Sequence, residues 1–213
     1  MRRLLIALTM ALIALPALAQ TQTDWCASPS ATDDQTIAGC NALIQSGREA
    51  AASLASDYNN LAEAFNDQNL SDQALAAANQ SLALNASSAS AYTNRGLAYY
   101  GKGLDDLAIA DFDRAIALSP DASAGSNDSG NAFAYNDRGL AYARKGLTDK
   151  AVADYSQAIA FEPRYAKAYF NRGLAYEKTG HRDMALADYR TATTIEPDNT
   201  RMKAALDRLA GAP

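Results

Sequence analysis

The sequence predicts an all-α solenoid built from helical hairpins that repeat with a period of about 34 residues. Three long segments align with one another, and they contain the hexapeptides NRGLAY, DRGLAY and NRGLAY in that order. The interval from Gly139 to Gly173 equals one period, whereas the interval from Gly96 to Gly139 is longer. The surplus falls on the Gly/Ser/Asn-rich residues 123–131, which we interpret as a loop inserted between two intact units. A fixed period of this length is typical of repeat architectures.

Each repeating unit has the pattern of two helices joined by a tight turn. A first apolar segment of about 14 residues ends at a glycine suited to the left-handed conformation of a helix C-cap. A second segment carries small and aromatic residues at helical spacing and is followed by a proline. A glycine also lies in the middle of each first segment, where it costs about 1 kcal/mol relative to alanine. Its repeated use there predicts close helix contact. The mid-helix glycines are Gly96, Gly139 and Gly173, and the turn glycines are Gly103, Gly146 and Gly180.

These residues occupy the positions that define a known repeat. The first set is Tyr92, Gly96, Tyr99, Ala108, Phe112, Ala115 and Pro120, the second is Tyr135, Gly139, Tyr142, Ala151, Tyr155, Ala158 and Pro163, and the third is Tyr169, Gly173, Tyr176, Ala185, Tyr189, Ala192 and Pro197. The chain thus resembles the tetratricopeptide repeat (TPR) family. The resemblance implies a right-handed superhelical solenoid of helix-turn-helix hairpins.

The repeat register also predicts the organisation of the whole chain. A weaker copy precedes the three strong ones, and short helical segments at both ends are suited to cover the open faces of the solenoid. The expected parts are a signal peptide (1–19), a disulfide-pinned segment with a lead helix (20–54), a degenerate first repeat (55–88), a second repeat (89–122), the loop insertion (123–131), a third repeat (132–165), a fourth repeat (166–199), and a C-terminal capping helix and tail (200–213).

The N-terminus has the composition of a secretory signal peptide. Arg2 and Arg3 precede an apolar run that is too short to span a bilayer, and Ala17-Leu18-Ala19 supplies small residues for cleavage before Gln20. A short uncleaved anchor is the alternative. The cleaved form predicts a periplasmic or secreted protein with no membrane span.

The only two cysteines, Cys26 and Cys40, are expected to form a disulfide, because an even cysteine pair in an exported protein usually does. A metal site is the alternative, but their spacing does not suit one, and His181 is the only histidine.

In each strong repeat an arginine is followed, always at the same spacing, by an aspartate, and both are absent together from the weak repeat. This pattern predicts an ion pair between the two helices of each hairpin. The alternative is a row of ligand-binding arginines. The pairs are Arg95 with Asp111, Arg138 with Asp154, and Arg172 with Asp188.

Catalytic and cofactor-binding patterns are lacking in the sequence, so we expect no enzyme, no cofactor and no metal. The formal net charge is −5, and removal of Arg2 and Arg3 with the signal peptide leaves −7. An acidic chain of this kind repels phosphate backbones, which argues against a nucleic-acid partner.

In the TPR family, a set of first-helix positions faces a concave groove, and the resemblance places peptide-groove candidates in this chain accordingly. They are Thr93, Asn94, Leu97, Tyr100, Asn136, Asp137, Leu140, Arg144, Lys167, Phe170, Asn171, Leu174, Glu177 and Lys178. Packing between neighbouring helices is the alternative role for the leucines. The family's two-carboxylate clamp needs asparagine where this chain has Leu97, Leu140 and Leu174, which argues against an acidic peptide tail as the partner.

The sequence therefore predicts a non-catalytic adaptor of the cell envelope that binds a protein or peptide in its groove. Two alternatives remain open: a structural component that self-associates into an assembly or homo-oligomer, and an accessory subunit of an envelope enzyme or secretion machine.

Overall fold

The computed structural model describes residues 23–119 and 129–211, and within these ranges all regular secondary structure is helical. They contain ten α-helices and one short 3-10 helix, without a strand, so the predicted all-α class is confirmed. The segment predicted to be a signal peptide lies outside the described residues. The chain divides between Asn85 and Ala86 into two compact units.

The first unit is a helical hairpin preceded by a lead helix. Its elements are η1 (Trp25–Ala27), α2 (Asp33–Ser46), α3 (Ala51–Asp67) and α4 (Ser71–Leu84). Helix α2 begins with a capping box, in which Thr32 and Gln35 exchange side-chain-to-backbone hydrogen bonds, and it ends where Gly47 adopts a left-handed conformation. Its apolar stripe packs on α3, which places Ile37, Leu43 and Ile44 against the core of this unit.

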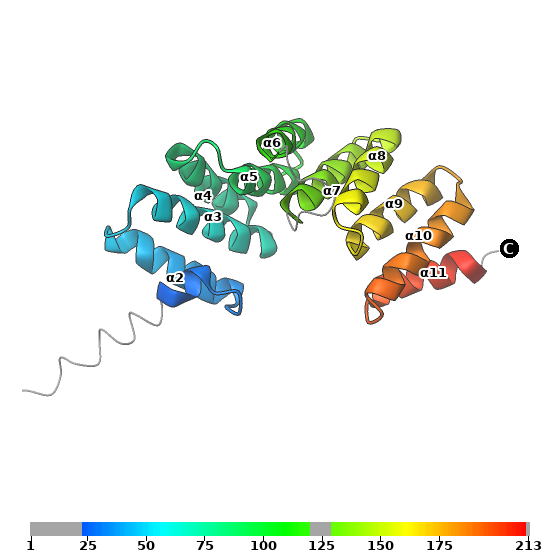
Figure 1. Cartoon of the computed structure of the whole chain (residues 1–213), viewed down its shortest axis with the longest axis horizontal. Coiled ribbons are helices and arrows are strands. Elements are labelled where there is room, and N and C mark those ends of the chain that lie inside the picture. The colour runs from blue at the N-terminus through cyan, green and yellow to red at the C-terminus, as the bar shows by residue number, and fades with distance from the viewer. Residues whose placement is uncertain (1–22, 120–128, 212–213) are drawn as a thin grey trace, which may run out of the picture. The chain divides into compact units, whose positions relative to one another are not determined.

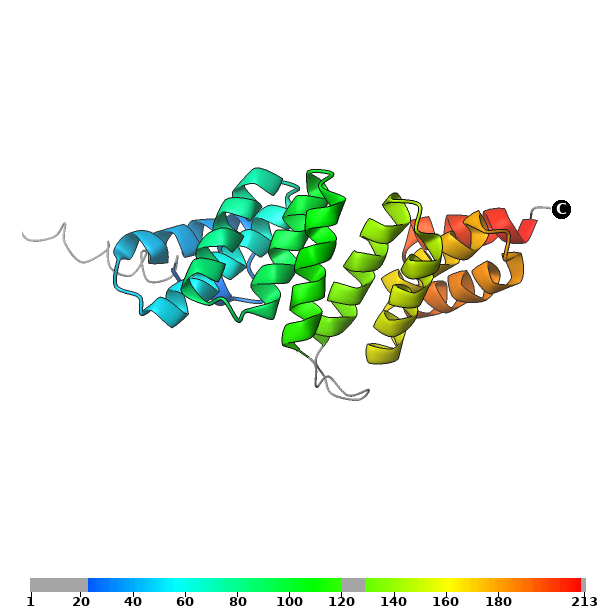
Figure 2. The same ribbon diagram turned by 90° about the horizontal axis from the view of Figure 1, so that it is seen from above.

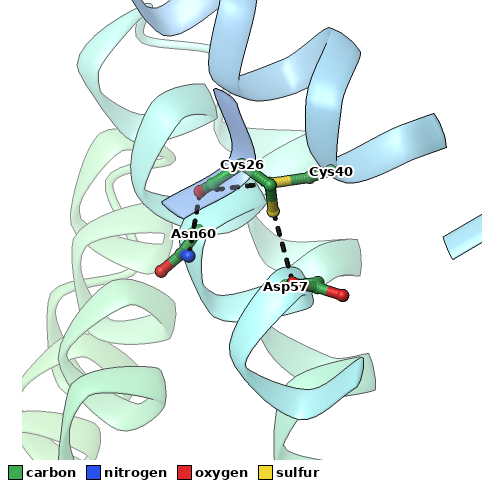
Figure 3. Close-up of a disulfide and its surroundings, with 4 residues drawn as sticks. All are labelled: Cys26, Cys40, Asp57 and Asn60. Atoms are coloured by element: carbon green, nitrogen blue, oxygen red, sulfur yellow. Dashed lines mark hydrogen bonds between the residues drawn. A yellow bond between two sulfur atoms is a disulfide. The ribbon is translucent and has the colours of Figure 1, made fainter. Parts of the chain in front are cut away.

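A disulfide between Cys26 and Cys40 ties η1 to α2 (Figure 3). Both cysteines are buried, and Leu61, Ala62 and Ala78 belong to the same apolar cluster. The amide Nδ2 of Asn60 donates a hydrogen bond of 3.0 Å to the carbonyl oxygen of Cys26, which joins η1 to α3 as well. The disulfide is therefore part of the core of the first unit.

The second unit consists of three helical hairpins and a final helix (Figures 1 and 2). Its elements are α5 (Ala89–Gly101), α6 (Asp105–Leu118), α7 (Ser129–Arg144), α8 (Thr148–Phe161), α9 (Ala166–Lys178), α10 (Arg182–Ile195) and α11 (Thr200–Gly211). Each hairpin pairs an odd-numbered helix with the next even-numbered one, and α11 packs on α10. Phe112, Tyr155 and Tyr189 occupy equivalent places in the three hairpins and are among the largest fully buried side chains.

The turns within these hairpins share one backbone geometry. At the end of α7, Gly146 has φ of 77°, its N–H bonds the carbonyl of Ala143, and the N–H of Leu147 bonds the carbonyl of Tyr142. This is the Schellman arrangement, in which a residue at positive φ satisfies the last carbonyls of a helix. In the first unit Asn69 takes the same role with φ of 59°. Asparagine tolerates this conformation better than most residues, so the weaker repeat keeps the turn without glycine.

Helix α7 begins earlier than the sequence predicts. Residues 129–131, which we assigned to the inserted loop, form its first turn. The rest of that predicted loop, residues 123–128, lies outside the described residues. Helix α3 likewise begins at Ala51, a few positions before the predicted start of the degenerate repeat.

Candidate functional site

The first helices of the three hairpins in the second unit lie next to one another, because α5 contacts α7 and α7 contacts α9. We use "A-helix face" for the surface of α5, α7 and α9 that carries the groove candidates. Polar contacts join these helices on that surface, and they include two hydrogen bonds. Nδ2 of Asn171 donates to Oδ1 of Asn136 at 2.9 Å, and Nη2 of Arg144 donates to the carbonyl of Tyr100 at 2.7 Å.

The groove candidates differ widely in exposure. The exposed ones are cations, and the buried ones are two asparagines and one phenylalanine. Arg144, Lys167 and Lys178 are exposed, Thr93, Leu97, Tyr100, Asp137, Leu140, Asn171, Leu174 and Glu177 are half-buried, and Asn94, Asn136 and Phe170 are buried.

A chain of amide hydrogen bonds crosses the A-helix face from α9 to α7. Asn136 accepts from Asn171 through Oδ1 and donates through Nδ2 to Oδ1 of Asp137 at 3.0 Å. The carboxyl group of Asp137 is half-buried, and burial raises its pKa to about 6 despite the hydrogen bond from Asn136 and the charge of Lys167. The sequence analysis selected all four residues but did not foresee this connection.

Arg144 is held against the preceding hairpin. Its guanidinium lies 3.6 Å from the centroid of the Tyr100 ring and bonds Oδ1 of Asp105 through Nε at 2.7 Å. The planar guanidinium suits this combination of stacking and hydrogen bonding. Arg144 and Tyr100 therefore fix α7 to α5 at one end of the A-helix face.

The C-terminal helix α11 engages three of the groove candidates. Phe170 is 5% exposed and belongs to a core cluster with Met202 of α11, and Leu174 packs against the same cluster. Glu177 bonds Arg208 of α11 and accepts a hydrogen bond of 2.7 Å from the hydroxyl of Tyr189. These three side chains therefore hold α11 and do not form an open surface.

Leu140 also has a packing role. It lies against a cluster that includes Tyr155 of α8 and Ala175 of α9. This position matches the alternative that we kept open for the leucines.

Each arginine of the repeated Arg–Asp pattern forms a two-bond ion pair across its hairpin. Arg138 bonds Asp154 at 2.8 and 2.7 Å through Nε and Nη2. Arg95 bonds Asp111 at 2.7 and 2.8 Å, and Arg172 bonds Asp188 at 2.8 Å through both nitrogens. The aspartates are buried, so these are the pairs expected from the repeated spacing.

Two arginines of these pairs also reach the preceding hairpin. Arg138 bonds Asp113 of α6 at 2.6 Å, and Nη1 of Arg172 donates to the hydroxyl of Ser156 in α8 at 3.0 Å. They therefore link successive hairpins as well as the two helices of one hairpin.

The described residues hold no group of three or more His, Cys, Asp or Glu side chains that could bind a metal ion. His181 lies at the turn before α10 and shares a hydrogen bond of 2.9 Å with the hydroxyl of Thr179. Within the part of the chain that is described, none of the helices is long and apolar enough to cross a membrane.

A polar cavity of about 340 Å³ lies in the first unit, and sequence reasoning missed it. Its walls come from the segment around η1, the start of α2, and one side of α3. Asp33, Glu63 and Asp67 line it, and burial together with the charges of the two aspartates raises the pKa of Glu63. Arg48 is the one basic residue among residues 23–85, against eight acidic residues, so the surroundings of the cavity carry negative charge.

Comparison with known proteins agrees with this architecture. A family model described as "TPR repeat" matches residues 139–180, and one described as "Tetratricopeptide repeat" matches residues 89–122 and 166–199. No match was found among curated proteins.

Solved structures with the same fold cover most of the chain. A thermophilic TPR protein of Thermus thermophilus has a TM-score of 0.68 at 21% identity, covering 92% of this chain and 99% of its own. MamA has a TM-score of 0.61 at 26% identity, and the match covers 90% of this chain and 99% of the MamA chain. The first TPR of Spaghetti (RPAP3), bound to the HSP90 peptide SRMEEVD, has a TM-score of 0.51 at 24% identity, covering 57% and 90%.

The fold and the matched positions define a solenoid of helical hairpins whose repeated geometry lies in packing and turn residues. The chain contains tetratricopeptide repeats, which the family models match at residues 89–122, 139–180 and 166–199.

Proposed function

We propose that this protein is a non-catalytic adaptor of the cell envelope that binds a protein or peptide along the A-helix face of its second unit. The observation that carries the proposal is that buried Asn136 bonds Asn171 on one side and Asp137 on the other, which holds two half-buried hydrogen-bonding side chains on neighbouring repeats. Repeat folds of this type offer an extended surface, and amide side chains can bond the backbone of an extended peptide.

The solved TPR domain in complex with SRMEEVD illustrates that such a fold can hold a peptide. Our chain differs at the positions where the family's clamp uses asparagine, because it has Leu97, Leu140 and Leu174 there. We therefore expect a partner other than an acidic tail.

The envelope location is supported by the signal-like N-terminus and by the buried disulfide, which is typical of an oxidising compartment. Fractionation of producing cells, with mass spectrometry of the N-terminal peptide, tests it. A mature chain that begins at Gln20 in the envelope fraction agrees with the proposal, and an intact Met1 terminus in the cytoplasmic fraction contradicts it.

Site-specific photocrosslinking in producing cells tests the binding surface. A probe at Lys167, which is exposed on α9, is compared with a probe at Gln157, which is exposed on α8. We expect one dominant protein partner from position 167 and no such product from position 157. Products that contain only this chain favour the self-associating assembly instead, and equal capture from both positions contradicts a specific surface on the A-helix face.

A further inference from the structure

Asp137 differs from the other shielded carboxylates in the helices of the second unit. Among the described helices of that unit, every buried or half-buried carboxylate except Asp137 forms an ion pair with an arginine. The paired residues are Asp105, Asp111, Asp154, Glu177 and Asp188. Asp137 accepts one hydrogen bond, from the neutral amide of Asn136, and forms no ion pair with the described residues. Burial of a charge without a counter-ion is costly, so this carboxylate is left in an unfavourable state.

The groups around Asp137 come from three helices and do not neutralise it. Lys167 of α9 acts on it through its field without forming an ion pair. The negative charge of Asp137 in turn contributes to the raised pKa values of Tyr155 in α8 and Tyr165 before α9. A phenol is neutral or, once deprotonated, negative, so neither tyrosine supplies a positive charge.

The amide chain fixes how Asp137 can be approached. Because Oδ1 of Asn136 is occupied by Asn171, the Nδ2 group of Asn136 must point towards Asp137. The second oxygen of the carboxylate, Oδ2, accepts no hydrogen bond from the described residues. One carboxylate oxygen is thus held, and the other is available to an external donor.

An aromatic surface lies beside this carboxylate. Phe133 precedes Asp137 by one helical turn on α7, is 43% exposed, and meets the ring of Tyr165 edge-on at 5.1 Å between centroids. Residues four apart on a helix are neighbours on its surface. An arginine or lysine side chain that reaches Asp137 could therefore lay its apolar stem, or its charged group, against an aromatic ring.

We propose that Asp137 is the anchor for an arginine or lysine side chain of a protein partner that lies on the A-helix face. The proposal rests on the proposed function and specifies its partner as one that presents a cation. Arginine fits better than lysine, because its planar guanidinium can form two hydrogen bonds to one carboxylate, as Arg95, Arg138 and Arg172 do with their aspartates.

The experiment uses N-acetyl-arginine methylamide as the probe on the full mature chain, with NMR detection of the Asp137 carboxyl carbon and of the side-chain amides of Asn136 and Asn171. The citrulline analogue, which has the same shape and no charge, is the matched ligand control. We expect saturable shifts at these three residues with the arginine probe and at least tenfold weaker binding of the citrulline analogue.

Protein variants separate recognition from folding. Asp137→Asn should weaken binding of the arginine probe at least tenfold, whereas Asp149→Asn, at an exposed carboxylate on α8, should leave it unchanged. Lys167→Gln should strengthen binding, since it removes a repelling cation. Because the pKa of Asp137 is raised to about 6, binding to the unmodified chain should fall as pH drops through that value. Probe shifts that persist in Asp137→Asn, or that do not weaken when the carboxylate is protonated, overturn the proposal.

The result is distinguishable from failure of the proposed function. If the crosslinking probe at Lys167 captures a partner equally well in the Asp137→Asn background, the A-helix face binds protein but Asp137 is not its anchor. A lower unfolding temperature of Asp137→Asn would indicate a structural role for Asp137 instead. Removal of an uncompensated charge should leave the unfolding temperature unchanged or raise it.

Discussion

Gly139 in α7 faces the buried ring of Tyr155 in α8 so closely that a Cβ atom at position 139 would lie 2.6 Å from Cε1 of the tyrosine. The same relationship recurs in the other two hairpins, where Gly96 faces Phe112 and Gly173 faces Tyr189, each at 2.7 Å. The glycines thus let two helices approach to a distance at which an aromatic ring fills the remaining space.

Gly139→Ala should give a net destabilisation of the second unit of up to about 2 kcal/mol. In a helix interior alanine is more favourable than glycine by about 1 kcal/mol, but overpacking a fixed core costs about 1–3 kcal/mol. Tyr155 is 1% exposed and cannot move aside. Urea unfolding measures the change. Gly211→Ala is the matched control, because a Cβ there meets nothing within 4 Å. A gain in stability of Gly139→Ala over the unmodified chain would contradict the close contact.

Arg138 offers a comparison of a buried and an exposed ion pair on one side chain. Asp154 is 8% exposed at its side chain and Asp113 is 52% exposed. We expect Asp154→Asn to cost about 3 kcal/mol, because it leaves a shielded arginine partly unpaired, and Asp113→Asn to cost less than about 1 kcal/mol. A double-mutant cycle with Arg138→Met should show coupling to Asp154 above about 1 kcal/mol. Equal effects at the two aspartates would mean that burial does not decide the strength of these pairs.

The sequence predicted contacts best where the same residue spacing recurs in successive repeats. A single spacing along the chain joins each arginine to its aspartate and each mid-helix glycine to the aromatic residue that it faces, so a contact inferred in one hairpin applies to all three. The fold class and the turns follow from the same periodicity. The periodicity did not predict the turn of the weak repeat, where Asn69, and not a glycine, takes the left-handed conformation.

The candidate site was only partly predictable, because it depends on contacts outside the repeat period. Phe170 and Glu177 occupy groove positions in the family pattern, yet α11 covers one and Arg208 binds the other. The register cannot indicate where a terminal helix docks. Similarly, the isolation of Asp137 becomes visible only when the partners of every neighbouring carboxylate are known.

Loss of the disulfide should weaken the first unit selectively. In the chain-entropy model, opening a loop of this length costs about 3 kcal/mol, so Cys26→Ala/Cys40→Ala should lower hydrogen-exchange protection in α2 about 100-fold. Helices α9 and α10, which belong to the second unit, provide the internal control and should keep their protection. Unchanged protection of α2 would show that the hydrogen bond from Asn60 and the apolar contacts alone hold η1 and α2 in place.

Asp57 should make the first unit less stable at neutral pH than in mild acid. Its carboxylate is buried beside the disulfide, with Oδ1 3.4 Å from Sγ of Cys26, and Oδ2 has no hydrogen-bond partner among the described residues (Figure 3). An oxidised sulfur carries no proton to donate, so this contact does not compensate the charge. Burial, and secondarily the charge of Glu49, raise the pKa of Asp57 above its ordinary value of 3.8.

The sign follows from proton binding. Between pH 3.8 and the higher pKa of the folded state, the folded chain holds more protons at Asp57 than the unfolded chain, so stability falls as pH rises through this window and stays lower above it. Asp57→Asn removes the charge and should raise the hydrogen-exchange protection of α3 at pH 7 while changing it little at pH 3.5. Asp24→Asn, at an exposed carboxylate of the same unit, is the matched control and should show no such difference. Hydrogen exchange in α3 at both pH values measures this protection. Lower protection in Asp57→Asn at pH 7 would mean that the carboxylate is stabilised by its surroundings.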